Sequence, residues 1–271
     1  MSEPVGDMVF TGSIPKLYEM YLVPLIFQPY ATEVLSRLPG SLCRLLEIAA
    51  GTGVVTRALA AALPANVEIV ATDLNEAMLQ HAESLGTDRP VEWRQADAMA
   101  LPFPDESFDA VVCQFGAMFF PDKAKAFGEA CRVLRPGGAF VFSTWDRIEE
   151  NEFVDTVTKA LESIFPDDPP RFHARVPHGY HSVATMERDL ATAGFTGTPE
   201  FSLVAKRSEA RSARKVAMAY CQGTPLRNEI EERDASLLGD ATVVAIRALT
   251  ERFGTGPISG KIQAHVVKVV K

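Results

Sequence analysis

The sequence of 271 residues is 47% hydrophobic and 23% charged, a composition typical of a globular protein with one large domain or two small ones. Its formal net charge of -8 argues against binding to the phosphate backbone of nucleic acids. The most basic stretch, KRSEARSARK at residues 206–215, is best explained as a solvated helix face.

The four cysteines lack the C-x-x-C pairing and the nearby histidines of a zinc site. Cys43, Cys113 and Cys131 lie in apolar runs and are expected in the core. The N-terminal residues lack the regions of a secretory signal, and the longest apolar runs are shorter than a membrane span. We therefore expect a soluble, cytoplasmic protein without a membrane partner. The sequence leaves the oligomeric state open, with a homodimer as one candidate.

Residues 17–38 have the apolar spacing of a helix that Pro24 interrupts and that ends at Pro39 and Gly40. From residue 42 to residue 145, apolar strands and helices alternate. The expected strands are residues 45–49, 67–72, 91–95, 108–114 and 139–144, and the expected helices are residues 56–63, 75–85 and 122–134. This alternation predicts a parallel sheet with helices on both faces.

Beyond residue 150, the periodicity predicts two helices, two strands and a helical excursion between those strands. They are residues 153–164 and 182–193 for the helices, 201–206 and 261–270 for the strands, and 212–232 and 242–253 for the excursion. Two late strands separated in this way indicate a sheet edge that carries an inserted helical cap.

His173, His178 and His181 crowd a Pro-rich loop together with Tyr180. Their spacing lacks the matched cysteine or carboxylate of a metal site, so no metal is expected. A histidine in this loop titrates in the right range to act as a general base for a phenolic or enolic substrate. A mobile surface loop is the simpler interpretation.

The stretch LLEIAAGTGVVTRALA, residues 45–60, places a Gly-rich turn between a strand and a helix. No lysine follows the glycines, which excludes a phosphate-binding P-loop. Gly51 and Gly53 meet the first two positions of the dinucleotide fingerprint G-x-G-x-x-G, but Thr56 stands at the third. Asp73 lies where that fingerprint expects an acid, so the fit to a dinucleotide site is partial.

The same turn resembles the first motif of the class I S-adenosylmethionine (SAM)-dependent methyltransferases, an acid followed by G-x-G-x-G. Glu47 matches the acid, Gly51 and Gly53 match the last two glycines, and Ala49 replaces the first. Alanine excludes only a positive φ or a very close backbone approach, so we treat this departure as minor.

Two later stretches resemble the same family in order and spacing. They are RQADAMALPFPDESFDAVVCQFG at residues 94–116 and FGEACRVLRPGGAFVFSTWD at residues 127–146. The sequence of these motifs most resembles the small-molecule branch of the family that includes the ubiquinone and menaquinone C-methyltransferases. That branch points to the cofactor and leaves the substrate open.

The resemblance implies that Asp73, followed by Leu74, accepts both ribose hydroxyls of SAM. It implies that Asp97 accepts the adenine amino group while the backbone amide of Ala98 meets the ring. Met78 would contact the adenine face, although core packing alone explains this residue nearly as well. An N-cap role for Asp73 is compatible with ribose binding.

The resemblance also implies that Glu47 orients the cationic methionine end of SAM and that Gln114 lies beside the transfer site. Tyr21 or Tyr18 of the N-terminal segment would touch the methionine end. Satisfying backbone groups at a strand end explains Gln114 equally well, and packing on the sheet explains the tyrosines at least as well. Asp109 is interpreted as a turn residue.

The implied fold is a three-layer, Rossmann-like α/β sandwich whose seven-stranded sheet is mostly parallel, with an antiparallel last strand. We expect a single domain, residues 1–271, with a SAM-binding core at 42–146. Cap or lid segments are expected at residues 10–40, 150–181 and 207–256.

The implied activity is transfer of the SAM methyl group to a small, apolar or aromatic acceptor, with S-adenosylhomocysteine as the other product. No catalytic residue is assigned. The alternatives are a SAM-binding protein that regulates or does not catalyse, and an NAD(P)-dependent oxidoreductase. The oxidoreductase would need a Tyr-x-x-x-Lys or similar catalytic pair, and the sequence offers none.

Overall fold

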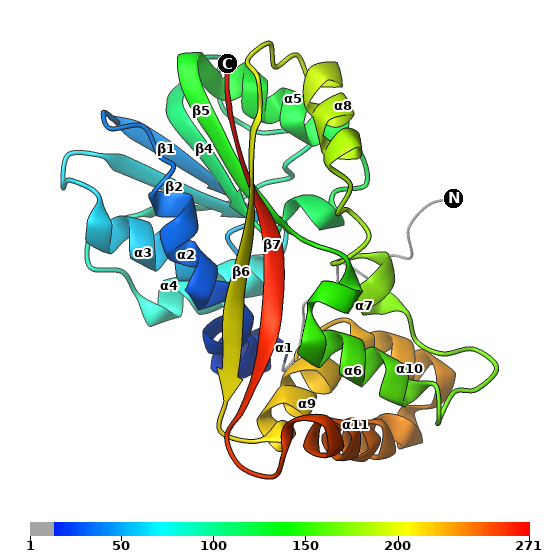
Figure 1. The fold of residues 1–271 in the computed structure, drawn as a ribbon. Coiled ribbons are helices and arrows are strands. Elements are labelled where there is room, and N and C mark those ends of the chain that lie inside the picture. The colour runs from blue at the N-terminus through cyan, green and yellow to red at the C-terminus, as the bar shows by residue number, and fades with distance from the viewer. Residues whose placement is uncertain (1–13) are drawn as a thin grey trace. The chain divides into compact units, whose positions relative to one another are not determined.

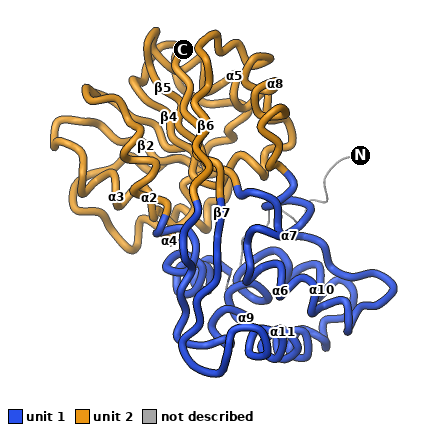
Figure 2. The backbone as a smooth tube through the Cα atoms, in the orientation of Figure 1, with its two compact units in different colours: residues 1–29, 145–179, 205–263 blue, residues 30–144, 180–204, 264–271 orange. Residues whose placement is uncertain are grey.

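The computed structural model describes residues 14–271, which form two compact units (Figures 1 and 2). Within the described chain, unit 1 comprises residues 14–29, 145–179 and 205–263, and unit 2 comprises residues 30–144, 180–204 and 264–271. The units roughly divide the predicted cap segments from the predicted core. Residues 10–13 of the first predicted cap segment lie outside the described residues.

A seven-stranded sheet has the strand order β3-β2-β1-β4-β5-β7-β6. Its strands are β1 Arg44–Ile48, β2 Glu68–Asp73, β3 Glu92–Gln95, β4 Phe108–Gln114, β5 Leu134–Trp145, β6 Glu200–Ala210 and β7 Ile258–Val270. The first five are joined by parallel pairings. Strands buried on both faces read as near-continuous apolar runs, which is why the sequence predicted β1, β2, β4 and β5.

Strand β7 runs antiparallel to β5. The Gly137 amide donates to the Lys271 carbonyl at 3.1 Å, and the Asp146 amide donates to the Gln263 carbonyl at 3.0 Å, so residue numbers rise along one strand as they fall along the other. The first of these bonds explains why β5 begins at Leu134 and not at the predicted residue 139. The Pro-Gly segment pairs with the chain's C-terminal end instead of forming a free turn.

Helices cover both faces of the sheet in unit 2. They are α2 Gln28–Leu35, α3 Val54–Ala62, α4 Glu76–Leu85, α5 Lys123–Val133 and α8 Val183–Thr192. Figure 1 shows α3 and α4 on one side of the strands and α5 and α8 on the other. Fully buried Phe127 of α5 packs on Phe140 and Phe142 of β5, with ring centroids 5.3 and 5.0 Å away. The predicted three-layer α/β fold is confirmed.

Before α2, the chain forms α1 Ile14–Leu17 and then a π-helix, η2, at Tyr18–Phe27. Pro24 lies inside η2 and does not end the helical path. The wider π-turn accommodates proline. In an α-helix, the proline ring would clash with the carbonyl four residues earlier.

The remaining helices belong to unit 1. They are α6 Glu152–Leu161, α7 Phe172–Arg175, α9 Ala213–Gln222, α10 Leu226–Asp234 and α11 Leu238–Phe253, with short 3-10 turns at Ile148–Glu150 and Ala235–Leu237. The predicted single helix at 212–232 is therefore two helices. The break falls at Gly223, Thr224 and Pro225, where a residue before proline disfavours helical geometry.

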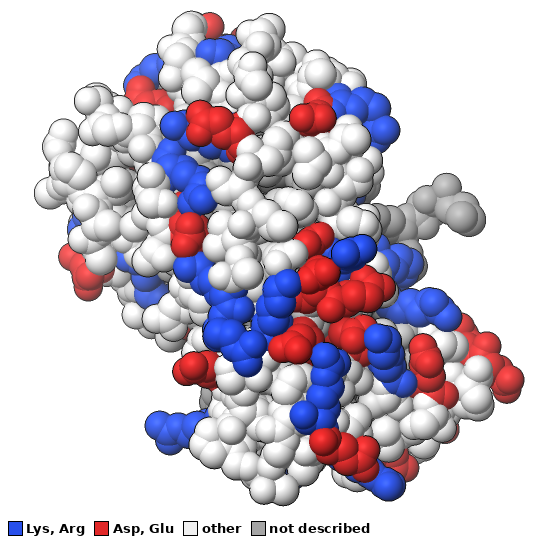
Figure 3. Space-filling model, viewed as in Figure 1, with Lys and Arg blue, Asp and Glu red and all other residues white. Residues whose placement is uncertain are grey.

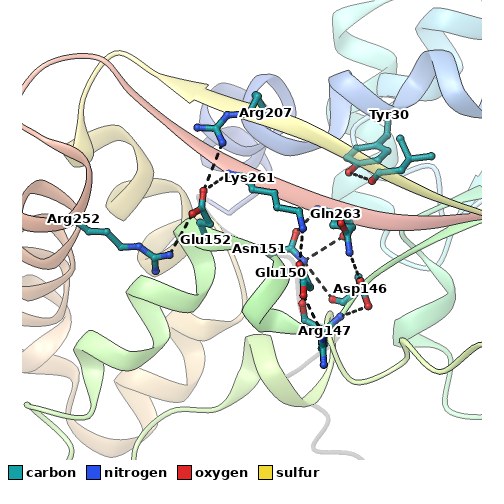
Figure 4. Close-up of polar contacts among 11 residues, drawn as sticks. Tyr30, Asp146, Arg147, Glu150, Asn151, Glu152, Arg207, Arg252, Lys261 and Gln263 are labelled. Carbon is teal, nitrogen blue, oxygen red and sulfur yellow. Dashed lines mark hydrogen bonds and ion pairs between the residues drawn. The ribbon is translucent and has the colours of Figure 1, made fainter.

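A polar network inside unit 1 ties the segment after β5 and the start of α6 to β7 (Figure 4). The side chain of buried Asn151 makes the pair of hydrogen bonds that the backbone of a neighbouring strand would make. It accepts from the Gln263 amide at 3.0 Å and donates to the Gln263 carbonyl at 3.3 Å. Lys261 bonds Glu150 through its ammonium group at 2.6 Å and Glu152 through its backbone amide at 2.5 Å. Each buried or half-buried group in this network has a partner, as stable polar networks require.

Three further expectations from the sequence need correction. Cys43 is exposed, whereas Cys113 and Cys131 are buried as predicted. Asp109 is a strand residue of β4 and not a turn residue. The basic stretch 206–215 begins in β6 and only then enters α9, so it is not one helix face.

On the surface drawn in Figure 3, basic and acidic side chains interleave. Within the described residues, no helix has the length and apolar character needed to cross a bilayer.

Candidate functional site

Four of the predicted site residues lie at or just beyond the carboxyl ends of four neighbouring strands in unit 2. Glu47 is near the end of β1, Asp73 and Gln114 end β2 and β4, and Asp97 follows β3. Because β3, β2, β1 and β4 are adjacent and parallel, these ends share one edge of the sheet. This edge, at the switch in strand order, is where ligands bind in open α/β sheets.

Glu47 is a buried carboxylic acid, with 2% of its surface exposed. The Thr56 hydroxyl of α3 donates to its Oε2 atom at 2.6 Å. The pKa of Glu47 is raised to about 8, chiefly by burial and also by the nearby charge of Asp73, against the lowering effect of the Thr56 bond. Thr56, which the sequence marked only as a missing glycine, therefore positions Glu47. The sequence signal was a hydroxyl residue in the first turn after the Gly-rich loop.

The loop after β1 requires left-handed backbone at three positions. Ala49, Gly51 and Gly53 have φ values of 54°, 57° and 80°. The replacement of glycine by Ala49 is therefore not minor, since this position has the positive φ that glycine adopts most readily. Its methyl group also fills space beside Gly116, where an added Cβ would lie 2.4 Å from the Ala49 Cβ.

Asp73 holds this loop in place. Its Oδ2 atom accepts from the Gly51 amide and its Oδ1 atom accepts from the Asn75 amide, each at 2.8 Å. Burial raises the pKa of Asp73, and the bonds from Asn75 and Gly51 oppose that rise. Asn75, not Asp73, is the N-cap residue of α4, and its side chain makes no capping bond.

The loop after β3 lies beside Asp73, because the Ala96 amide donates to the Asp73 carbonyl at 3.0 Å. Asp97 in this loop is half-buried and accepts from the Met99 amide at 2.8 Å, and Ala98 is buried. In the segment after β2, Leu74 is 47% exposed and Met78 of α4 is 4% exposed.

Strain gathers at the end of β4 as well. Gln114 pairs with Ser143 of β5, and Phe115 then has a φ of 55°. Phe115 is buried, its amide donates to the Ser143 carbonyl at 3.1 Å, and its ring meets Tyr30 edge-on at 5.3 Å. Tyr30 in turn donates to the Val204 carbonyl at 2.9 Å (Figure 4). A bulky residue at positive φ is uncommon, and such strain clusters at functional sites. No sequence pattern indicates this strained residue.

Two sets of predicted residues belong to unit 1. Tyr21 lies in η2 and is half-buried, and Tyr18 stacks on Phe27 at 4.9 Å, so their contact with a cofactor stays a prediction. The histidine-rich segment is not the surface loop that the sequence suggested, since His173 and His178 are 3% and 6% exposed. Packing among apolar and aromatic side chains buries these two histidines.

The chemistry of the strand-end site favours a ligand with positive charge and hydroxyl groups. Glu47 and Asp73 supply buried acceptors, and a cationic group placed beside them would favour their ionised forms, whereas a phosphate would disfavour them. Their raised pKa values mark them as a functional-site candidate, because perturbed acids cluster at such sites. Among the described residues, no group of three or more histidine, cysteine, aspartate or glutamate side chains is arranged to hold a metal ion.

Comparison with known sequences matches residues 46–142 to the methyltransferase domain family. A demethylmenaquinone methyltransferase of Clavibacter sepedonicus is 45% identical over 105 residues, which cover 37% of this chain and 42% of the relative. A ubiquinone/menaquinone biosynthesis C-methyltransferase of Rickettsia massiliae is 33% identical over 130 residues, which cover 45% of this chain and 52% of the relative. The chain thus spans about half the length of the curated relatives it matches.

Solved structures share the fold at lower identity. The YcgJ protein of Bacillus subtilis has a TM-score of 0.55 at 21% identity, over 89% of this chain and 96% of its own. Phosphoethanolamine N-methyltransferase 2 of Haemonchus contortus, solved with phosphomonomethylethanolamine and S-adenosylhomocysteine, has a TM-score of 0.57 at 16% identity, over 95% and 56%. The [4+2]-cyclase SpnF has a TM-score of 0.53 at 18% identity, over 89% and 80%.

Proposed function

We propose that this chain, whose residues 46–142 belong to the methyltransferase domain family, transfers the methyl group of SAM to a small, apolar or aromatic acceptor. The observation that carries the proposal is the pair of buried acids at neighbouring strand ends, Glu47 and Asp73, beside a left-handed Gly-rich turn. Bound SAM supplies a methyl group activated by a positively charged sulfur atom, and it carries no phosphate.

The residues of this site suit the separate parts of that cofactor. We expect Asp73 to accept the ribose hydroxyls. We expect Glu47 to ionise beside the cationic methionine end, because a nearby positive charge lowers the pKa of an acid. Asp97 keeps an oxygen for the adenine amino group, Ala98 offers a backbone amide, and Met78 and Leu74 supply apolar surface. Gln114 would then lie beside the acceptor.

The catalytic task of the chain is mainly positional. A neutral leaving group needs no stabilising charge, so holding the acceptor in line with the methyl group and excluding water are the principal contributions of the protein. Relatives that act on quinones support an aromatic acceptor.

A second candidate is SAM binding that serves another reaction or a regulatory role. The observation in its favour is that a [4+2]-cyclase shares this fold over 89% of the chain. An NAD(P)-dependent oxidoreductase fits less well, because a pyrophosphate would have to lie beside two buried acids and Thr56 replaces the third glycine of the fingerprint.

Calorimetric titration with SAM, S-adenosylhomocysteine and NADH tests the cofactor. We expect saturable binding of the first two compounds and none of NADH. Asp73→Asn keeps one oxygen for a loop amide and removes the charge, so it should weaken SAM binding about 10- to 100-fold. The exposed Asp88→Asn carries the same charge change and should bind as the wild type does. Equal SAM affinity in wild type and Asp73→Asn would remove the ribose assignment.

A further inference from the structure

Two loops of unit 2 contact each other beyond the carboxyl ends of the paired strands β1 and β4. Ala49 begins the Gly-rich turn after β1, and Gly116 lies just beyond Gln114, the last residue of β4. A Cβ atom built on Gly116 would lie only 2.4 Å from the Cβ atom of Ala49. The methyl group of Ala49 therefore occupies the space that any side chain at position 116 would need.

Each of these loops holds a side chain in a backbone conformation that favours glycine. Ala49 has a φ of 54°, and Phe115, directly before Gly116, has a φ of 55°. Of the three non-glycine residues with positive φ in the described chain, two thus lie at this contact. Left-handed backbone costs free energy for a residue with a Cβ atom, and it persists only where the surroundings impose it. Glycine at position 49 would avoid this cost, but it would lose the methyl contact with Gly116.

The Gly-rich turn is held from two sides. Toward β2, the Ala50 amide donates to the Thr72 carbonyl at 2.9 Å, and the Gly51 amide donates to Asp73 at 2.8 Å. Toward β4, the half-buried Ala49 packs its methyl group against buried Gly116. Close packing restricts the movement of a backbone, because neighbouring atoms leave it little empty space. The methyl group therefore limits how far the turn can move away from β2.

We propose that Ala49 is a positioning residue whose methyl group, packed against Gly116, holds the Gly-rich turn in the conformation that binds SAM. The role in SAM binding rests on the proposed function. A turn that samples other conformations binds its ligand more weakly, in proportion to the fraction of molecules in the competent one. Gly51 and Gly53 follow Ala49 and add backbone freedom to the turn. The strain at Ala49 is thus offset by a better ordered cofactor loop.

Three variants remove, add or transfer this methyl group. Ala49→Gly removes it, and Gly116→Ala adds a second methyl group to space that is already filled. The double variant transfers the methyl group from one loop to the other. Gly116 has a φ of -99°, which alanine adopts without strain. Once Ala49 is glycine, the nearest neighbour of the new Cβ atom is the Cys113 Sγ atom at 2.9 Å, a terminal side-chain atom and not backbone.

Stability and SAM binding should change in opposite directions in Ala49→Gly. Its thermal midpoint should equal or exceed that of the wild type, yet calorimetry should show about tenfold weaker SAM binding, as for a turn that is competent about a tenth of the time. Without ligand, the amide hydrogens of Gly51 and Gly53 should exchange faster than in the wild type. The double variant should restore both properties, whereas Gly116→Ala alone should lower the midpoint and weaken SAM binding. The control Ala139→Gly, buried in β5, should lower the midpoint and leave SAM affinity unchanged.

Either a wild-type SAM affinity or wild-type exchange rates in Ala49→Gly would overturn the proposal, because the methyl group would then fill space without holding the turn. A double variant that binds SAM no better than Ala49→Gly would overturn it too. Should Gly116→Ala fail to fold, Ala49→Gly and the double variant still decide. If the wild type does not bind SAM, the proposed function fails, and the exchange rates of Gly51 and Gly53 then decide whether Ala49 holds the turn.

Discussion

Glu47 shows how burial of one side chain makes stability depend on pH. Its ordinary pKa of 4.5 in the unfolded chain rises to about 8 in the folded protein, chiefly because of burial. Between these values the native state holds a proton that the unfolded chain has released. The free energy of unfolding should therefore fall as the pH rises from 4.5 to 8.

Replacement of Glu47 by glutamine keeps an amide oxygen for the Thr56 hydroxyl and removes the titrating group. We expect Glu47→Gln to flatten the fall of stability with pH, as measured by urea unfolding at a series of pH values. Glu83→Gln, on the exposed side of α4, should leave the slope of the wild type unchanged. The same slope in wild type and Glu47→Gln would show that this acid is ionised in the folded protein.

Ala49 should respond to mutation in the opposite sense to an ordinary alanine. Because its φ is 54°, Ala49→Gly relieves left-handed strain of about 1–2 kcal/mol while losing about 0.4–1 kcal/mol through the freer unfolded chain. We expect a thermal unfolding midpoint equal to or above that of the wild type. Ala71→Gly, buried in β2, should lower the midpoint. A loss in Ala49→Gly as large as in Ala71→Gly would contradict the strain.

At the scale of elements, Asp109 joins the beginnings of two parallel strands. Its Oδ2 atom accepts from the amides of Cys43 and Arg44 at 2.7 and 2.8 Å, and Arg135 of β5 bonds its Oδ1 atom at 2.5 Å. Although partial burial acts to raise the pKa of Asp109, these bonds together hold it below its usual 3.8. A carboxylate that the folded state favours contributes stability above pH 3.8, and this is lost as the pH falls through the lowered pKa.

We therefore expect Asp109→Asn to destabilise the protein by about 1–3 kcal/mol at neutral pH, because asparagine has one side-chain oxygen and no charge. Either Arg135 or the two backbone amides lose their acceptor. In acid the difference from wild type should shrink, since the wild-type carboxyl is then protonated too. Urea unfolding at neutral pH and below pH 3.8 measures both values. A difference that stays constant with pH would mean that the charge of Asp109 plays no part.

Across the whole molecule, the features that the sequence predicted are those that depend on short-range pattern. Strands β1, β2, β4 and β5 could be predicted because they are apolar runs. Asp73 could be predicted because it follows a strand at the spacing of a known motif. The antiparallel direction of β7 was expected only from the family resemblance, and the strand order comes from the structure. Helix ends differed by a few residues, as local pattern alone allows.

The features that the sequence missed depend on contacts between distant residues. Thr56 reaches Glu47 only after a loop has reversed the chain, and the φ of Phe115 depends on its bond to Ser143. His173 lies in a polar stretch that reads as a loop, yet Thr224, which is 51 residues away, fixes it in the interior. No periodicity records such pairings.

The residues that the sequence singled out are divided between the two units. The strand-end acids belong to unit 2, whose core matches the methyltransferase domain family, while His173 and Tyr21 belong to unit 1. The sequence-based prediction of one domain with cap segments at 10–40, 150–181 and 207–256 stays a prediction. The segments outside residues 46–142 lie beyond the match to that family.

Methyl transfer by this protein can be tested by mass spectrometry of the products of a single reaction. The full chain is incubated with SAM and a panel of hydroxylated and quinone-like aromatic acceptors. The account predicts S-adenosylhomocysteine formed only when a suitable acceptor is present, together with a product heavier by one CH2 group. SAM that binds yet yields no S-adenosylhomocysteine with any acceptor, or fails to bind at all, would contradict it.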